Sequence, residues 1–282
     1  MSWKFVPATE FSSVARSWDA LNDDAGGIPF LGSAFLQAAL DHFGEGDELV
    51  ALRDGDGQTT SALILQRKGI GKWHTFQPSQ LPLGPFLQKQ DAGLNHRSIA
   101  ELFRALPGLP MMIGLTQLDP MVVPRPDEGT TLSTLDYIQT AWVEIEGDFE
   151  SFWAARGKNL RDNVRKLGKK LSTDGITARL EQVTDPLEMR EAIEDYAKLE
   201  TAGWKRSVGT AVSMQTAQGR FYVDMMEGMA KLGQARAYRY FFDESLVAMD
   251  LCVEYRDMMV VLKTAYDETF GKLSPATLMR EQ

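Results

Sequence analysis

The stretch that decides the fold is QARAYRYFFDESLVAMDLCVEYRDMMVVLKTAYDETFGKLSPATLMREQ, residues 234–282. It contains three apolar runs, 234–242, 245–255 and 258–266, which are separated by the polar pairs Asp243-Glu244 and Arg256-Asp257. Short polar turns between runs rich in β-branched and aromatic residues are typical of hairpins. The three runs therefore predict an antiparallel meander.

A loop and a helix start follow the third run. The apolar pattern breaks at Tyr266-Asp267, and the chain then passes through Gly271 to Ser274-Pro275. Serine is a favoured helix cap, and proline fits the first helical position because its missing N–H would have no partner there. We therefore expect Ser274 to cap a helix that begins at Pro275.

The segments before the meander alternate between strand and helix signals. AWVEIEG at 141–147 and ITARLEQV at 176–183 have the pattern of strands, and the residues between them, 148–171, have that of one long basic helix. Asp185, Pro186 and Glu188 form a capping-box start for the next helix. Another helix is expected at 216–232.

The first half of the chain has weaker signals. We expect a helix at 34–43, a hairpin whose turn is Gly55-Asp56-Gly57, an edge strand among the prolines of 72–88, a helix at 97–106 and a strand at 111–118. Residues 119–131 carry three prolines and a glycine and are the best linker candidate. The sequence thus indicates two lobes, 1–130 and 131–282.

Composition and charge exclude several classes of protein. The chain is 44% hydrophobic, as soluble globular proteins are, and its net charge of -9 argues against a general nucleic-acid or membrane-surface binder. Cys252 is the only cysteine, which excludes an intrachain disulfide and a thiolate zinc site and suits the cytoplasm. The three histidines are scattered, so no metal is expected. No apolar run is long enough to span a membrane.

Four segments in this order carry a resemblance to a known superfamily. They are FWAARGKNLRDNVRKLGKKL, ETAGWKRSVGTA, RFYVDMMEGMAKLGQARAYRY and VLKTAYDETFGKLSP, which lie between residues 152 and 275, a span of a little under half of the chain. The order resembles the GNAT acyltransferase fold, in its two-lobed branch of CelD-like acetyltransferases and Fem-type aminoacyl transferases. The resemblance implies an α/β (α+β) fold of tandem GNAT-like lobes, with mixed, mostly antiparallel sheets flanked by helices and a degenerate first lobe.

The resemblance also implies acetyl-CoA, or another acyl-CoA, as co-substrate. Its pyrophosphate would need free backbone N–H groups, such as those at the helix start after the loop 269–273. Family members usually place glycine after the serine-proline pair, whereas this chain has Ala276. The methyl group of Ala276 would hinder a close approach of the CoA phosphates to the backbone. The cofactor-binding candidates are Lys263, Gly271, Lys272, Ser274, Ala276 and Thr277.

Polar residues on the last two strands are the catalytic candidates. Tyr266 could protonate the leaving thiolate and Asp267 could act as an orienter or a base; alternatively, the pair forms a strand-end turn. Asp250, Cys252 and Glu254 alternate along one strand and so share a face. Asp250 or Glu254 could be the general base, or the row could be a stripe that faces solvent.

The sequence indicates the residues that bind the acceptor less clearly than those that bind the cofactor. Arg161 and Arg165 lie one turn apart on the basic helix, which is either a local anion site or a solvated face. Glu200, Trp204 and Lys205 could line the acceptor pocket, although Trp204 could instead anchor the end of a helix.

The resulting hypothesis is an N-acyltransferase that moves an acetyl group to an amine by direct attack. The family implies a small-molecule acceptor such as an amino sugar or a cell-envelope or exopolysaccharide precursor. Two alternatives stay open: a Fem-type transferase that uses aminoacyl-tRNA, and a non-catalytic GNAT-like binding or assembly protein. The sequence stops at Gln282, before a further strand that the fold requires, so we expect an incomplete second lobe. Nothing in the sequence indicates an oligomeric state.

Overall fold

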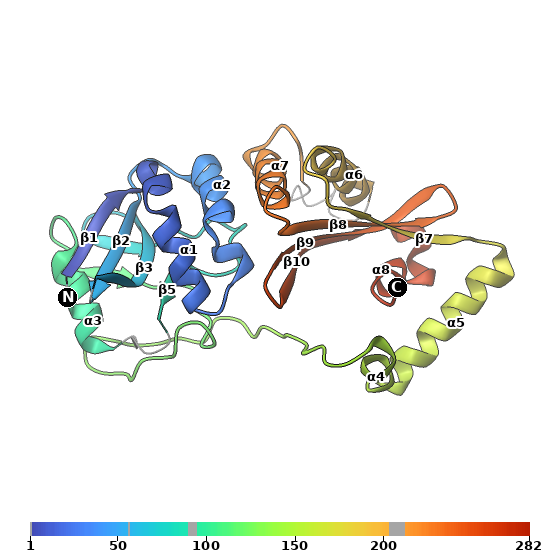
Figure 1. Ribbon diagram of the computed structural model, residues 1–282, viewed down its shortest axis with the longest axis horizontal. Helices are drawn as coiled ribbons and strands as arrows, with labels where there is room; N and C mark the ends of the chain where they lie inside the picture. Colours follow the sequence, from blue (N-terminus) through green and yellow to red (C-terminus); the bar gives the residue numbers. More distant parts are fainter. Residues whose placement is uncertain (1, 56, 90–94, 203–211) are drawn as a thin grey trace. The chain divides into compact units, whose positions relative to one another are not determined.

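The computed structural model describes residues 2–55, 57–89, 95–202 and 212–282. The chain divides into two compact units. The first comprises residues 1–137, 220–229 and 254–259, and the second comprises 138–219, 230–253 and 260–282. Both are mixed α/β structures with a sheet flanked by helices, as the sequence predicts (Figure 1). The expected lobe boundary at 130/131 and the incomplete second lobe stay predictions.

In the described part of the first unit, six strands form one sheet in the order β1-β2-β3-β4-β6, with β5 paired to β3. The β4·β6 pair is parallel and the others are antiparallel. The strands are β1 (Ser2–Pro7), β2 (Leu49–Gly55), β3 (Gln58–Arg67), β4 (Lys72–Thr75), β5 (Phe86–Gln88) and β6 (Met112–Gly114). The helices are η1 (Ala8–Ser13), α1 (Ala15–Asp24), η2 (Pro29–Leu31), α2 (Ser33–Phe43) and α3 (His96–Ala105).

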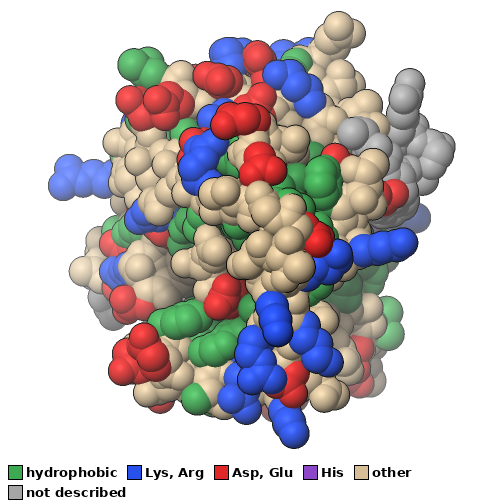
Figure 2. All heavy atoms as spheres, turned by 90° about the vertical axis from the view of Figure 1, so that its right-hand side faces the viewer, with side chains coloured by type: hydrophobic (Ala, Val, Ile, Leu, Met, Phe, Trp, Pro, Cys, Tyr) green, Lys and Arg blue, Asp and Glu red, His purple; other side chains and the backbone are tan. Residues whose placement is uncertain are grey.

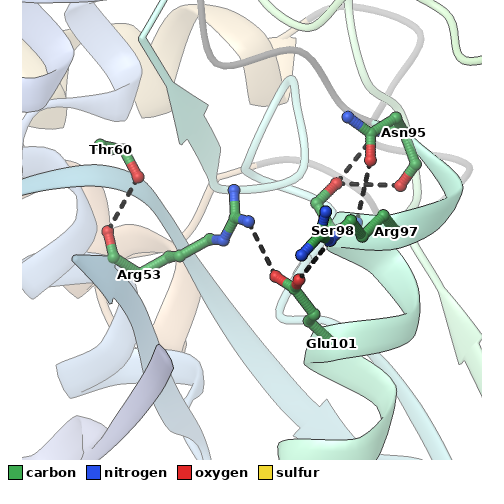
Figure 3. Close-up of polar contacts among 6 residues, drawn as sticks. All are labelled: Arg53, Thr60, Asn95, Arg97, Ser98 and Glu101. Carbon is green, nitrogen blue, oxygen red and sulfur yellow. Dashed lines mark hydrogen bonds and ion pairs between the residues drawn. The ribbon is translucent and has the colours of Figure 1, made fainter. Parts of the chain in front are cut away.

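Helix α3 is fixed to this sheet by polar contacts (Figure 3). Asn95 caps the helix in a capping box with Ser98. One turn further, Glu101 accepts a 2.8 Å hydrogen bond from Arg53 on β2 and another from Arg97. The Arg53 hydrogen bond is the main reason why the pKa of Glu101 lies below its usual value. The predicted hairpin of β2 and β3 and the helices near 34–43 and 97–106 are confirmed, whereas β6 is shorter than expected.

The second sheet has the strand order β10-β9-β8-β7 (Figure 1). Its strands are β7 (Ala178–Val183), β8 (Ala235–Phe242), β9 (Ser245–Tyr255) and β10 (Met258–Tyr266). The predicted meander is confirmed, with Asp243 and Arg256 at positive φ in its two turns. The helices of this half are α4 (Phe149–Ala154), α5 (Lys158–Asp174), α6 (Met189–Ala202), α7 (Ala217–Ala230), η4 (Glu268–Leu273) and α8 (Pro275–Met279).

An apolar core lies on one face of the second sheet. Its buried members come from α5, β8, β9 and the C-terminal segment: Val164, Leu167, Leu171, Tyr240, Phe242, Val247, Ala248, Leu273, Leu278 and Met279. Val164, Leu167 and Leu171 recur at i, i+3 and i+7, so one stripe of α5 packs inward and its opposite face meets solvent. This core holds α5 and α8 on the same face of the sheet.

Three expectations about the second half are wrong. Residues 141–147 form no strand, because no strand lies beside them in the described part of the chain. The single helix at 148–171 is two helices, because the backbone of Gly157 is extended and starts α5 anew. The α6 helix starts at Met189, and Asp185 instead holds a turn through Leu187 N. Within the described residues, no helix is long and apolar enough to cross a membrane.

Candidate active site

The two faces of the second sheet are covered by different helices. Asp250 pairs across the strands with Tyr238, which packs against the core under α8. The next pair is Arg239 with Met249, and the Arg239 guanidinium lies 2.9 Å from Asp195 on α6. Helices α6 and α8 lie on opposite faces of the second sheet (Figure 1). Since adjacent residues of a strand point to opposite faces, Asp250 faces α8 and Arg239 faces α6.

On the α8 face, Asp250 is held by an arginine. Its side chain is 4% exposed, and its two oxygens accept hydrogen bonds of 2.9 and 3.1 Å from Nε and Nη2 of Arg280. Arg280 also donates a 2.6 Å bond to Thr264 on β10. The hydrogen bonds to Asp250 are the main reason why the pKa of Arg280 is raised. The arrangement fixes the end of α8 against two strands.

This pairing changes the interpretation of the predicted carboxylate row. Asp250 is 3% and Cys252 is 1% exposed, so these two residues do not form a stripe that faces solvent. Glu254 is half-buried. Both oxygens of Asp250 are engaged by the Arg280 guanidinium, which favours an orienting role for Asp250. Arg280 could not be predicted as a site residue, because no local sequence pattern links it to Asp250, 30 positions earlier.

On the α6 face, the structure brings together two candidates that the sequence assigned separately. Glu200, 3% exposed, accepts hydrogen bonds from Tyr196 Oη (3.2 Å) and from the backbone N–H of Val212 (2.6 Å). Its Oε1 lies 3.8 Å from Nζ of Lys263 on β10. Lys263, expected near the cofactor, thus forms an ion pair with Glu200, expected near the acceptor.

The end of β10 carries the predicted catalytic pair. Tyr266 is 42% exposed, so its hydroxyl can be reached from solvent. Asp267 Oδ1 accepts hydrogen bonds from the backbone N–H (2.8 Å) and hydroxyl (2.7 Å) of Thr269 and so caps η4. Asp267 therefore fulfils the turn-forming alternative, and the role of Tyr266 as proton donor stays a prediction.

The predicted phosphate cradle differs from its expected form. Ser274 precedes Pro275 as expected, but its φ is 47° and its side chain makes no capping hydrogen bond, so the expected side-chain cap is wrong. Residues 268–273 form a 3-10 helix rather than an open loop. Ala276 packs against the core, whereas Gly271 and Lys272 are exposed and Thr277 is half-buried. Their roles in cofactor binding stay predictions.

The basic helix α5 presents cations to solvent. Lys158, Arg165, Lys166, Lys169 and Lys170 are exposed. Figure 2, which faces the right-hand side of Figure 1, shows Lys and Arg side chains gathered in one area. Asp162 binds Arg165 at 2.9 Å, and Asp174 binds Lys170 at 2.7 Å. Arg161 instead turns back and donates to the carbonyl of Arg156.

Two candidates cannot be placed. Trp204 and Lys205 lie outside the described residues. In the rest of the chain, which the structure describes, no group of three or more His, Cys, Asp and Glu side chains could hold a metal ion.

Comparison with known proteins finds a domain family that matches the second half of the chain. Residues 158–282 match the model of the acetyltransferase (GNAT) domain family. This match spans α5, α6, α7, α8 and the whole second sheet, including every candidate residue above. Residues 158–282 are a GNAT domain.

The fold around the GNAT domain is shared by a solved structure. The crystal structure of FemX aligns over 100% of this chain and 84% of its own chain, with a TM-score of 0.54 and 12% sequence identity. At this identity the likeness shows a common fold. No curated protein matches the chain at a significant level. The match to the acetyltransferase (GNAT) domain family covers residues 158–282, and the likeness to FemX extends to the fold of the whole chain.

Proposed function

We propose that the chain is an N-acyltransferase that moves an acetyl or related acyl group from acyl-CoA to an amine. The observation that carries this proposal is the GNAT domain at residues 158–282. Amino sugars and precursors of the cell envelope or of exopolysaccharide are the acceptor class that the sequence resemblance suggests.

In the proposed reaction, the acceptor amine attacks the thioester carbon directly. The new C–N bond forms as the C–S bond breaks, CoA leaves as the thiolate and takes up one proton, and the amine gives up one proton to water. Tyr266 is the proton donor that we propose for the thiolate, because it is exposed at the end of β10. Backbone N–H groups that point at the carbonyl oxygen would stabilise its developing charge. No covalent enzyme intermediate is required.

Release of free CoA thiol from acetyl-CoA, measured with a panel of amines, tests this proposal. We expect release to depend on one class of amine and to fall about 10²-fold in Tyr266→Phe, because a positioned proton donor contributes on this scale. Tyr137→Phe, at another exposed tyrosine, is the matched control and should keep full activity. Amine-dependent release with equal rates in both variants would exclude Tyr266 as the donor.

A second candidate function rests on the exposed cations of α5. A transferase that uses aminoacyl-tRNA would need a surface for phosphates, and Lys158, Lys166 and Lys169 offer three exposed ammonium groups. Filter binding of tRNA at 50 and 200 mM salt tests this alternative, since each phosphate contact makes binding salt-dependent. Binding that weakens with salt and falls further in K158E/K166E/K169E supports it. Absence of binding excludes it.

A further inference from the structure

A row of polar side chains crosses the first sheet. Trp3 on β1 lies opposite Arg53 on β2. Arg53 lies opposite Ser61 on β3, which in turn lies opposite Gln88 on β5. Residues directly opposite each other on neighbouring strands project from the same face of a sheet. The side chains of these four residues, which we call the donor row, therefore share one face.

Three residues of the donor row carry buried N–H groups that have no hydrogen-bond partner among the described residues. The nitrogens are Nε1 of Trp3, Nε of Arg53 and Nε2 of Gln88. In the described part of the chain, only Arg239, in the second sheet, has other buried side-chain nitrogens in this condition. Buried donors without an acceptor are rare, because each has given up its hydrogen bonds to water. Three of them in one row point to a bound acceptor.

The donor row leads from the edge of the sheet into its interior. In the described structure β1 is an edge strand, and Trp3 is half-buried there. The side chain of Arg53 is 11% exposed, whereas Ser61 is 5% and Gln88 is 1% exposed. The short side chain of Ser61 stands between the two long ones of Arg53 and Gln88. Trp3 is thus the end of the row nearest to solvent.

The charges beside the donor row favour an anion. Nη2 of Arg53 donates to Glu101 on α3 at 2.8 Å, and Arg97 donates to the other oxygen of Glu101 at 3.1 Å (Figure 3). Two guanidinium groups share one carboxylate, so one positive charge is left. Water would fit the row less well, because it brings hydrogens of its own that need acceptors, and both oxygens of Glu101 are engaged.

We propose that the donor row binds a small carboxylate. A carboxylate has about four lone-pair sites on its two oxygens, so it can accept from several N–H groups at once. Its single negative charge matches the single positive charge left beside the row. Phosphate carries more charge at neutral pH, and the excess would be buried without a partner. The donor row lies in the first unit, outside residues 158–282, so this proposal does not rest on the proposed acyl transfer.

The indole N–H resonance of Trp3 reports binding most directly. In the full chain labelled with ¹⁵N-tryptophan, Trp3→Phe identifies this resonance among the six indole signals. Titration with sodium acetate at constant pH and ionic strength should displace it along a saturable curve. The indole of Trp142, which is 65% exposed, should stay in place.

Sodium chloride and sodium phosphate are the comparison anions for this titration. We expect both to displace the Trp3 resonance less than acetate does at the same concentration. Absence of displacement by acetate would overturn the proposal, because the row would then hold water only. Equal displacement by chloride, or tighter binding of phosphate, would overturn the choice of a carboxylate.

A variant of the buried amide gives a second readout. Gln88→Leu removes one donor and should weaken acetate binding at least about 10-fold, because a hydrogen bond to a charged group contributes on this scale. Gln58→Leu, at an exposed glutamine of β3, is the matched control and should bind acetate as the wild type does. Equal acetate affinities of the two variants would contradict the proposal.

Melting temperatures provide a test that does not depend on a single variant. Saturating acetate should raise the melting temperature of the wild type, because a ligand that binds only the folded state stabilises it. Trp3→Phe removes another donor of the row and should show a smaller rise, as Gln88→Leu should. A rise of the same size in both variants and in the wild type would show that acetate acts elsewhere and would overturn the proposal.

Discussion

At the scale of single residues, the Asp250–Arg280 pair connects α8 to the central strand. The Asp250 side chain is 4% exposed and the Arg280 side chain is 52% exposed, so the pair is buried at its carboxylate end only. Removal of the arginine would leave a charge without its partner in a low-dielectric site. Removal of the carboxylate leaves an arginine that can still reach water, which is the milder change.

Arg280→Met should lower the free energy of unfolding by about 3 kcal/mol, because it strands the buried Asp250 carboxylate. Asp250→Ala should cost about 2 kcal/mol, since Arg280 keeps part of its hydration. Urea unfolding measures both. Asp162→Ala, which breaks an exposed pair with Arg165, is the control and should change stability by less than about 1 kcal/mol. If Arg280→Met and Asp162→Ala lowered the free energy of unfolding equally, the Asp250–Arg280 pair would not be the buried, stabilising contact described here.

Burial of Tyr240 should make the folded protein less stable at alkaline pH. Its side chain is 1% exposed, and burial raises its pKa to about 12 from the usual 10. The folded state therefore keeps a proton that the unfolded state loses above pH 10, so stability is full below that pH and falls between about 10 and 12. Urea unfolding at pH 8 and pH 11 should show a loss of roughly 1 to 2 kcal/mol, which Tyr240→Phe reduces. A loss of the same size in the phenylalanine variant would refute the role of Tyr240.

At the scale of elements, Gly157 determines where α5 begins. It occupies the N-cap position, where no side chain caps the first turn, and a Cβ added there would meet nothing within 4 Å. Gly157→Asp should stabilise the protein by about 0.5 kcal/mol, because a carboxylate can accept a first-turn N–H and interacts favourably with the helix dipole. Urea unfolding with Gly157→Ala as control, which adds the Cβ without the cap, measures this effect. A variant no more stable than the alanine control would disprove it.

The elements that the sequence predicts well are those specified locally. The turns at Asp243 and Arg256 need only two residues each, and the hairpin of β2 and β3 needs only its short turn between apolar runs. Residues 141–147 have an equally clear strand pattern, but a strand also needs a neighbour, which the pattern does not supply. The break at Gly157 was missed because an isolated glycine is tolerated within many helices.

At the scale of the whole molecule, the candidate site joins segments far apart in the sequence. Lys263 meets Glu200 across 63 positions and Arg280 meets Asp250 across 30, and no sequence spacing indicates either pair. The sequence predicts which strands carry the polar residues. It does not predict that the side chains of Lys263 and Asp250 lie on opposite faces of the second sheet and form ion pairs with different helices. The resemblance to GNAT acyltransferases predicted a GNAT domain in the second half of the chain, and the match at residues 158–282 confirms it.

The central claim is that this GNAT domain uses acyl-CoA. Calorimetric titration of the full chain with acetyl-CoA tests it most directly, with desulfo-CoA analogues and free adenosine as controls for the thioester and the nucleotide. We expect saturable binding with a dissociation constant between about 1 µM and 1 mM, the range in which enzymes hold their substrates. Absence of saturable heat at millimolar acetyl-CoA, from protein whose circular dichroism shows it to be folded, would contradict the claim.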